Sequence, residues 1–227
     1  MWKVRVFTLY PESFPGPLGI GLYKKATEKK LWSLEVVNIR DYSNDKHKTV
    51  DDNPFGGGSG MLMRADVIAN SLDKNIPDKN ERIIYLSPKG KKLEQNHAKQ
   101  MLNKNINIIC GHFEGVDQRL LETRNIEEIS VGDFILSGGE IGAFVLIDTI
   151  VRLIPGVLGN SNSLTDETFE KNLLEYPQYT KPQKWEKKDV PEVLLTGDHA
   201  KIKDWRLAQA EDITRRRRPD LWKRYKK

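Results

Sequence analysis

Short apolar stretches alternate with longer amphipathic ones along the first 155 residues of this chain. The short stretches are typical of strands and cover residues 4–9, 34–39, 82–86, 106–110 and 126–131. Helical spacing of apolar residues marks the segments 18–30, 64–74, 91–103, 116–122 and 140–154. Strands that alternate with helices form mostly parallel sheets. We therefore predict an α/β fold with a mostly parallel sheet and helices on both faces.

The segment 140–154 is apolar on almost every side of the expected helix. Such a helix has to be covered all round. We expect the sheet on one side of it and a partner, such as a second subunit, on the other. Ser137 and Glu140 also match a capping box at its start.

Composition changes after this helix. Pro155 and Gly156 end it, and residues 159–163 are polar and typical of a linker. An aromatic and proline-rich segment, 176–182, precedes a helix over 198–215 and a last helix that begins at Pro219. We predict an α/β domain over 1–158, a linker over 159–168 and a small helical domain over 169–227.

The charge is unevenly distributed. The chain carries 37 basic and 32 acidic residues, a net charge of +5. Residues 201–227 hold 11 and 4 of these, a net of +7, which leaves a net of −2 for the first 200 residues. A basic end on a near-neutral body is typical of a polyanion-binding surface, although a solvated helix surface gives the same pattern.

Several cations are candidate phosphate contacts in an RNA complex: Lys46, Lys48, Arg206, Arg215, Arg216, Arg217 and Arg218. Aromatic side chains are interleaved with them at Tyr176, Tyr179, Trp185, Trp205 and Trp222. Such rings stack on unpaired bases. For Trp205 and Trp222, packing between helices is the commoner role.

The single cysteine, Cys110, excludes an intrachain disulfide. No apolar run reaches the ~18 residues that a membrane helix needs, and the first residues lack the pattern of a signal peptide. We expect a cytoplasmic protein that does not bind membranes.

Glycine-bearing loops follow three of the predicted strands, at residues 87–90, 111–115 and 137–139. In open α/β sheets, ligands bind beyond the carboxyl ends of the strands. Together these loops predict a small-molecule site, although each one alone is more typical of an ordinary tight turn. The dinucleotide fingerprint, the P-loop, the nucleophile elbow and a zinc site all lack required residues.

The chain resembles the bacterial tRNA (guanine-N1)-methyltransferases of the TrmD type, in the SPOUT class. The matching stretches occur in the family's order at residues 49–63, 85–90, 110–117, 131–140, 147–148, 152–159, 176–182 and 191–199. The resemblance implies a SPOUT fold with a deep trefoil knot, and a homodimer with its active site at the subunit interface. It also implies methyl transfer from S-adenosyl-L-methionine to N1 of guanosine 37 in tRNA, with magnesium dependence. The ligands of any metal stay unknown.

By the same resemblance, the methyl-donor site consists of Tyr85, Leu86, Ser87, Pro88, Gly90, Gly111, Glu114, Gly115, Val131, Gly132, Asp133, Phe134, Ile135, Leu136, Gly138 and Gly139. The family's catalytic arginine falls on Arg152, and its linker aspartate on Glu167, beside Asp166. The family's arginine and tyrosine after the strand are replaced by His112 and Phe113.

The chemistry gives these residues roles. Guanine N1 carries a proton at neutral pH, so the reaction needs a carboxylate base and a cation near O6, where negative charge develops. Glu167 or Asp166 would be the base and Arg152 the cation. For Arg152, a charge that offsets the helix dipole is the plain alternative. Glu114 would orient the guanine or the donor, or join a metal site.

Two other functions stay open: a SPOUT methyltransferase with another target nucleotide, and a non-catalytic RNA-binding protein that retains the fold. Donor binding separates the enzymes from the binder.

Overall fold

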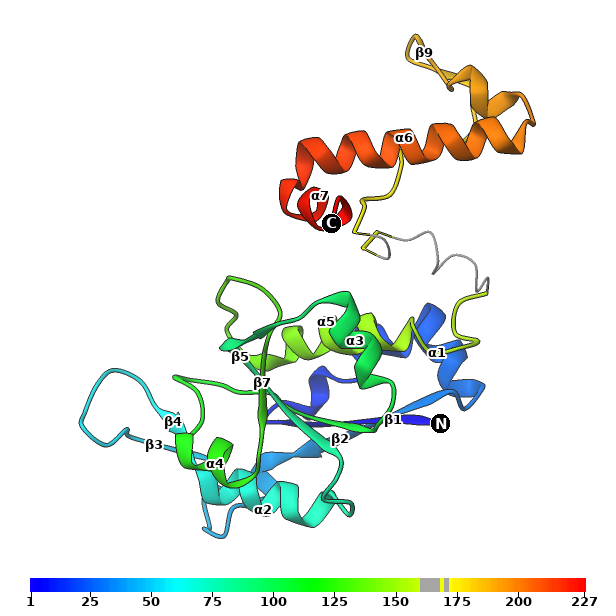
Figure 1. The fold of residues 1–227 in the computed structure, drawn as a ribbon. Coiled ribbons are helices and arrows are strands. Elements are labelled where there is room, and N and C mark those ends of the chain that lie inside the picture. The colour runs from blue at the N-terminus through cyan, green and yellow to red at the C-terminus, as the bar shows by residue number, and fades with distance from the viewer. Residues whose placement is uncertain (160–167, 170–171) are drawn as a thin grey trace. The chain divides into compact units, whose positions relative to one another are not determined.

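The computed structural model describes residues 1–159, 168–169 and 172–227 (Figure 1). The chain divides into two compact units, Met1–Gly159 and Asn160–Lys227. Each unit is described by itself.

The first unit is built on a five-stranded sheet in the order β2-β1-β6-β5-β7. Every neighbouring pair in it is parallel. The predicted parallel sheet is therefore confirmed. Its strands are β1 (Trp2–Thr8), β2 (Trp32–Asn38), β5 (Arg82–Lys92), β6 (Ile106–Ile109) and β7 (Glu127–Ser130). A separate antiparallel pair joins β3 (Asp51–Asp52) to β4 (Leu62–Met63).

Helices lie on both faces of the sheet (Figure 1). One face carries α2 (Ala65–Asn75) and α4 (Gln118–Thr123), and the other carries α1 (Gly21–Glu28), α3 (Gln95–Met101) and α5 (Gly139–Val151). Beneath α2 and α4, the apolar core gathers Phe7, Ile109, Leu72 and Leu120. Three single turns complete the unit: Pro11–Ser13, Gly16–Gly19 and Ile39–Tyr42.

The strand predicted over 82–86 does not end at Leu86. Residues 87–90 leave the ladder as a bulge, and both Leu86 and Lys91 lie opposite Ile129. The ladder with β7 resumes at Lys91, so the helix predicted over 91–103 begins only at Gln95. Backbone pairing with β7 thus keeps Lys91 and Lys92 in the strand, although the spacing of apolar residues from 91 onward predicted a helix.

The helix predicted over 18–30 is also shorter than expected. A 3-10 turn, Gly16–Gly19, occupies its start, and α1 begins at Gly21. Gly21 has a φ of +56°, a conformation that favours glycine and interrupts a regular helix.

The apolar helix α5 packs against β1 and β5 on its inner side. Leu146, Ile147 and Ile150 are fully buried there, whereas Ile141 and Val145 are 57% and 45% exposed. The predicted capping box is wrong: Gly138 is the N-cap residue, with no side-chain cap, because Glu140 turns inward to other partners.

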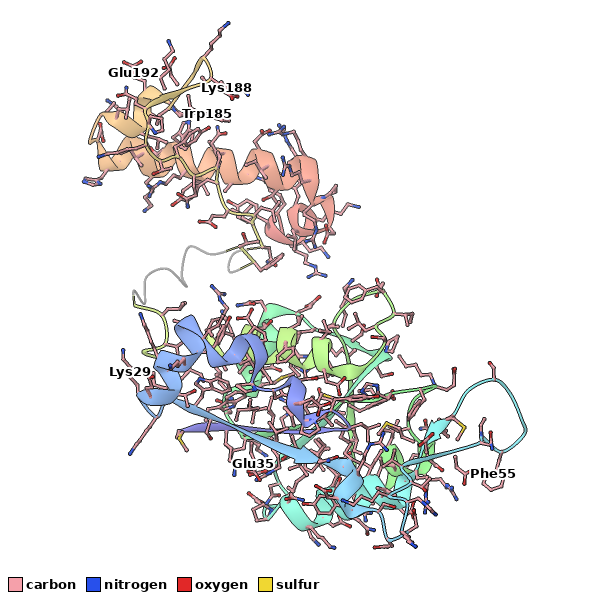
Figure 2. The ribbon with its side chains drawn as sticks, turned by 180° about the vertical axis from the view of Figure 1, so that it is seen from behind. Lys29, Glu35, Phe55, Trp185, Lys188 and Glu192 are labelled. Carbon is pink, nitrogen blue, oxygen red and sulfur yellow. The ribbon has the colours of Figure 1, made fainter. Side chains whose placement is uncertain are left out.

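The second unit contains a hairpin and two helices. The predicted helices are confirmed as α6 (His199–Arg217), with Asp198 as its N-cap, and α7 (Pro219–Tyr225). The hairpin was not predicted; it pairs β8 (Lys184–Trp185) with β9 (Lys188–Asp189), and a turn at Glu192–Leu195 follows it. Figure 2 labels Trp185 and Lys188 on this hairpin.

Candidate functional site

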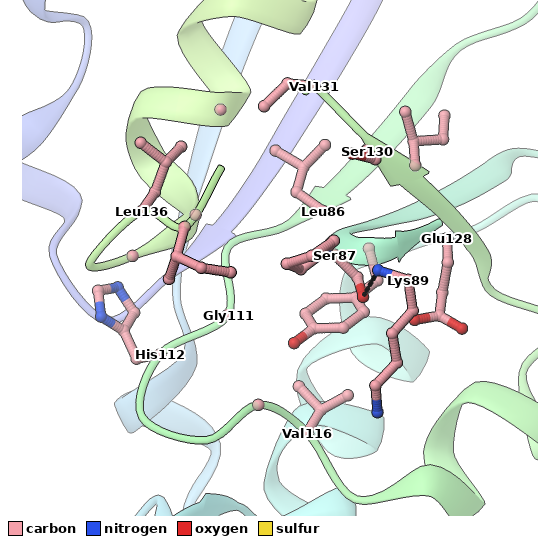
Figure 3. A pocket seen from close by; sticks show the side chains of 18 of the residues that line it. Leu86, Ser87, Lys89, Gly111, His112, Val116, Glu128, Ser130, Val131 and Leu136 are labelled. Carbon is pink, nitrogen blue, oxygen red and sulfur yellow. Dashed lines mark hydrogen bonds between the residues drawn. The ribbon is translucent and has the colours of Figure 1, made fainter. Parts of the chain in front are cut away.

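A cavity of about 350 Å³ lies at the bulge within β5 and beyond the carboxyl ends of β6 and β7. Residues of the bulge that begins at Ser87, of the loop after β6 and of the loop between β7 and α5 line it (Figure 3). The three strands are adjacent in the sheet. The predicted convergence of three loops is therefore confirmed.

Fourteen of the sixteen residues predicted to form the methyl-donor site line this cavity. They are Tyr85, Leu86, Ser87, Pro88, Gly111, Glu114, Gly115, Val131, Gly132, Phe134, Ile135, Leu136, Gly138 and Gly139. The other two, Gly90 and Asp133, are not among its lining residues.

Packing and charge explain these two exceptions. A Cβ on Gly90 would lie 2.3 Å from the backbone nitrogen of Ile129, so this glycine permits the return of β5 to β7. The carboxylate of Asp133 is 87% exposed and lies 3.3 Å from the Lys92 ammonium. Gly90 thus shapes the cavity wall indirectly, and Asp133 faces solvent.

Close backbone approach closes one side of the cavity. The Gly139 amide donates a hydrogen bond of 2.9 Å to the Gly111 carbonyl. A Cβ on Gly139 would lie 2.5 Å from Cα of Cys110, which leaves no room for a larger residue. The start of α5 is therefore held directly against the loop after β6.

The cavity combines apolar and acidic groups. Leu86, Val131 and Leu136 supply apolar surface, and Glu114 and Glu128 supply carboxylates. Burial raises the pKa of the Tyr85 hydroxyl, and the Glu128 charge adds to this effect. Tyr85 therefore keeps its proton at neutral pH and is a hydrogen-bond donor in the wall.

Several lining residues were missed from the sequence. They are Lys89, His112, Phe113, Val116, Gln118, Leu121, Glu128, Ile129, Ser130, Ser137 and Gly142. Gln118 and Leu121 are three residues apart on α4, so they share a helix face that points to the cavity. The helical spacing of Gln118 and Leu121 was the sequence signal that could have identified them as lining residues. Most of the others adjoin predicted residues.

Behind the cavity wall lies a buried polar cluster of Thr8, His112 and Glu140. Both carboxylate oxygens of Glu140 lie 2.9 Å from Nε2 of His112, and the Thr8 hydroxyl donates to one of them at 2.5 Å. The Tyr10 ring meets the imidazole edge-on at 4.9 Å. Glu140 thus fixes the orientation of His112, which replaces the arginine of the resembling family.

Arg152 lies just past the last residue of α5, whereas the cavity lies at the first. A helix rises about 1.5 Å per residue, so about 20 Å separates the two ends. Arg152 is half-buried, and its charge acts on the Tyr23 hydroxyl, which hydrogen-bonds Asp148. Within one chain, the structure does not bring Arg152 to the cavity. Glu167 and Asp166 lie outside the described residues.

The predicted RNA-contact residues are divided between the two units. Lys46 and Lys48 are exposed on the first, where Lys48 pairs with Asp41 at 2.8 Å. On the second unit, Arg206 lies over the Tyr176 ring at 4.8 Å from its centroid.

The arginines near the end of α6 lie close to acids. Arg215 and Arg216 pair with Asp212, and Arg218 pairs with Asp220. Arg217 is exposed. Exposed pairs of this kind are worth less than about 1 kcal/mol, so RNA phosphates can replace their carboxylates.

The described residues contain no group of three or more His, Cys, Asp or Glu side chains placed to hold a metal ion. Among the described helices, none combines the length and the apolar character that crossing a membrane requires. The buried Cys110 thiol has a pKa well above its usual value because of burial and the nearby Glu140 charge, so it is not a nucleophile.

Known proteins match the chain along its full length. The family model of tRNA (guanine-1)-methyltransferase TrmD matches residues 2–224. A tRNA (guanine-N(1)-)-methyltransferase of Pelagibacter ubique is 67% identical, and the match covers all of both chains. The enzyme of the same name from a Chelativorans species is 53% identical over 99% of this chain and 96% of its own length. The chain therefore belongs to the tRNA (guanine-1)-methyltransferase TrmD family.

Proposed function

We propose that this protein transfers a methyl group from S-adenosyl-L-methionine to N1 of guanosine 37 in tRNA, next to the anticodon. The relatives at 53% and 67% identity are named as tRNA (guanine-N(1)-)-methyltransferases. The observation that carries the proposal is the cavity, which fourteen of the sixteen expected donor-site residues line.

The cavity suits the methyl donor. Its volume of about 350 Å³ lies in the range of small-molecule sites. Leu86, Val131 and Leu136 offer an apolar wall for a purine, and the carboxylates of Glu114 and Glu128 complement a cationic ligand. When bound, the donor supplies an electrophilic methyl group on a sulfonium.

The protein's own residues prepare the guanine. Glu167 or Asp166 removes the N1 proton, since a carboxylate is the base that this step needs. Arg152 stabilises the negative charge that develops at O6. Glu114, in the cavity wall, orients the guanine or the donor, or contributes to binding Mg²⁺.

A homodimer reconciles the positions of these groups. Arg152 and the cavity lie at opposite ends of α5, about 20 Å apart. The same helix exposes Ile141 and Val145, and Ile20 of the same unit is 67% exposed. We propose that a second copy covers this apolar face and brings its own Arg152 to the cavity, so that the active site lies at the subunit interface.

Three further features of the family complete the proposal. The first is a deep trefoil knot of the chain around the cavity, as the family resemblance implies. Residues 169–227 form the tRNA-binding domain, with residues 159–168 as linker. The protein acts in the cytoplasm.

The decisive experiment uses tRNA transcripts that carry or lack guanine 37. We expect labelled methyl groups from S-adenosyl-L-methionine to appear only on the transcript with guanine 37, and as 1-methylguanosine after digestion. Methylation of both transcripts would identify another target nucleotide. If calorimetry detected no donor binding, the alternative function, a non-catalytic RNA-binding protein that retains the fold, would be favoured. No feature of the described residues favours that alternative.

Single-turnover kinetics assign the base. Glu167→Ala and Asp166→Ala are compared, each with donor and tRNA saturating. We expect the variant that lacks the base to lose at least ~100-fold in rate, as is usual for a general base, while donor affinity stays unchanged. If Glu167→Ala retains the full rate, Glu167 is not the base.

Mixing two inactive variants tests the shared active site. Arg152→Ala removes the cation, and Leu136→Asp disrupts the donor cavity of the other chain. In a two-fold symmetric dimer, a 1:1 mixture forms mixed dimers with one intact site each, which restores about a quarter of the wild-type activity. No recovery after subunit exchange would place both groups in one chain.

A further inference from the structure

A second cavity lies entirely within the unit Asn160–Lys227. Its volume is about 450 Å³, and it lies between the extended segment at residues 176–183 and helix α6. Tyr176 and Tyr179 line it from the segment, and Ile202, Trp205 and Arg206 line it from the helix. It shares no lining residue with the cavity of the first unit.

Aromatic rings and cations line this second cavity together with the aliphatic side chains of Val190, Leu194, Leu195 and Ile202. Among the described residues that line it are two tyrosines, a tryptophan, Lys181 and Arg206, but neither Asp nor Glu. The Arg206 guanidinium lies 4.8 Å from the centre of the Tyr176 ring, and the Tyr179 and Trp205 rings are 6.3 Å apart. Tyr179 is 48% exposed, so part of its ring surface is open to a ligand.

This chemistry fits an unpaired nucleotide. Every nucleobase offers a flat surface that stacks on an aromatic ring, and its phosphate attracts a cation. The side-chain amides of Gln178 and Gln183, which also line the cavity, add hydrogen-bond donors and acceptors for base edges. The absence of carboxylates among the described lining residues avoids repulsion of the phosphate.

We propose that this cavity binds one unpaired nucleotide of the tRNA, different from the guanine that is methylated. The base stacks on Tyr179, and Arg206 contacts its phosphate. The inference rests on the proposed function, because the methylated guanine has to lie against the methyl-donor cavity. The second cavity would therefore hold the tRNA at another point and set its register.

The test compares Tyr179→Ala with a control on the same unit, Leu207→Ala. Leu207 is 48% exposed on α6 and does not line the cavity. Stacking on one aromatic ring accounts for about 5- to 150-fold in affinity. We expect Tyr179→Ala to weaken tRNA binding to the full-length protein within this range, Tyr179→Phe to keep wild-type affinity, and Leu207→Ala to stay within about twofold.

The salt dependence of tRNA binding separates the contribution of base stacking from that of phosphate contacts. Removal of a stacking ring lowers affinity equally at all salt concentrations, so Tyr179→Ala keeps the wild-type slope of log K against log salt. Arg206→Gln lowers that slope by about 1, as expected for one phosphate contact. Calorimetry with S-adenosyl-L-homocysteine should give the same affinity for all variants.

Three results would overturn the inference. The first is that Tyr179→Ala binds tRNA as tightly as Leu207→Ala does. The second is that the salt slope of Tyr179→Ala differs from that of the wild type. The third is a changed sedimentation coefficient of Tyr179→Ala without RNA, which would assign the cavity to a protein contact. Failure of the proposed function is recognised separately, because the wild-type protein would then methylate no transcript with guanine 37.

Discussion

Glu140 shows how one side chain links the cavity of the first unit to the core beneath it. The Glu140 side chain is buried, and its carboxylate contacts both Thr8 and His112. His112 in turn lines the cavity of the first unit. The local sequence favoured a helix cap for Glu140, but the inward partners are stronger, because a buried carboxylate requires hydrogen-bond donors.

Replacing Glu140 with Ala should therefore lower stability. The change leaves the Thr8 hydroxyl and the His112 imidazole without their carboxylate partner, which costs roughly 1–3 kcal/mol in the free energy of unfolding. Urea denaturation measures the loss. The control is Glu28→Ala at the exposed end of α1, which should change stability by less than about 0.5 kcal/mol. Equal effects of the two variants would contradict the role of the cluster.

Asp45 organises the loop that carries Lys46 and Lys48. Its carboxylate accepts hydrogen bonds from Ser43 and Thr49 and from the His47 amide. These bonds, led by that from Ser43, lower the pKa of Asp45 to about 2.

Because the pKa of Asp45 is lower in the folded protein than in the unfolded chain, its ionised carboxylate stabilises the loop at pH values above ~3.9, the ordinary pKa of Asp. This stabilisation is lost as the pH falls through about 2. An NMR titration of the side-chain carboxyl should show a midpoint at about 2. Asp45→Asn should lose the acid dependence in the loop's amide signals. A midpoint at the ordinary value for Asp would contradict these bonds.

At the scale of elements, α5 carries three roles. Its first turn closes the cavity of the first unit, its inner face packs on β1 and β5, and its outer side exposes Ile141 and Val145. Periodicity alone predicted a helix covered on every side. In the single chain, only the inner part is covered, and the remaining apolar stripe is the surface proposed to meet a second copy.

Val145→Glu tests that surface. Because Val145 is 45% exposed in the single chain, the charge should not disturb folding, but it should prevent dimerisation and lower methyl transfer at least tenfold. Sedimentation measures the mass, and circular dichroism checks the fold. Leu207→Glu, at a 48% exposed site on α6, is the matched control and should remain dimeric. A Val145→Glu variant that stays dimeric would move the interface elsewhere.

At the scale of the whole molecule, the net charge of +5 is the sum of two different surfaces. The cluster at Arg215, Arg216, Arg217 and Arg218 lies in the second unit, at the end of α6. Three of these arginines have acidic neighbours in exposed pairs. RNA phosphates would exchange with those carboxylates at little cost.

Changing these four arginines to Gln should weaken tRNA binding and flatten its salt dependence, by about 0.7–0.9 in slope for each phosphate that is no longer neutralised. Donor affinity should not change. The control removes the same number of charges from the exposed Lys24, Lys25, Lys29 and Lys30. An unchanged tRNA affinity in the arginine variant would exclude this cluster as an RNA contact.

The sequence by itself determined where the five strands of the parallel sheet lie and which segments form the cavity of the first unit. Apolar runs such as 106–109 form buried strands wherever a core exists, and glycines such as Gly111 and Gly139 mark places of close backbone approach. These are local properties, so periodicity and residue type suffice to predict them. The two helices near the end of the chain were predicted from the same kind of signal, helped by Asp198 and Pro219.

Tertiary structure alone decided the contacts between distant residues. The return of β5 to β7 at Lys91 depends on Ile129, and the partners of Glu140 lie 28 and 132 residues away. The distance between Arg152 and the cavity depends on which end of α5 faces the loops. No local pattern encodes such choices, because they follow from competition among hydrogen-bond and packing partners that only the folded chain brings together.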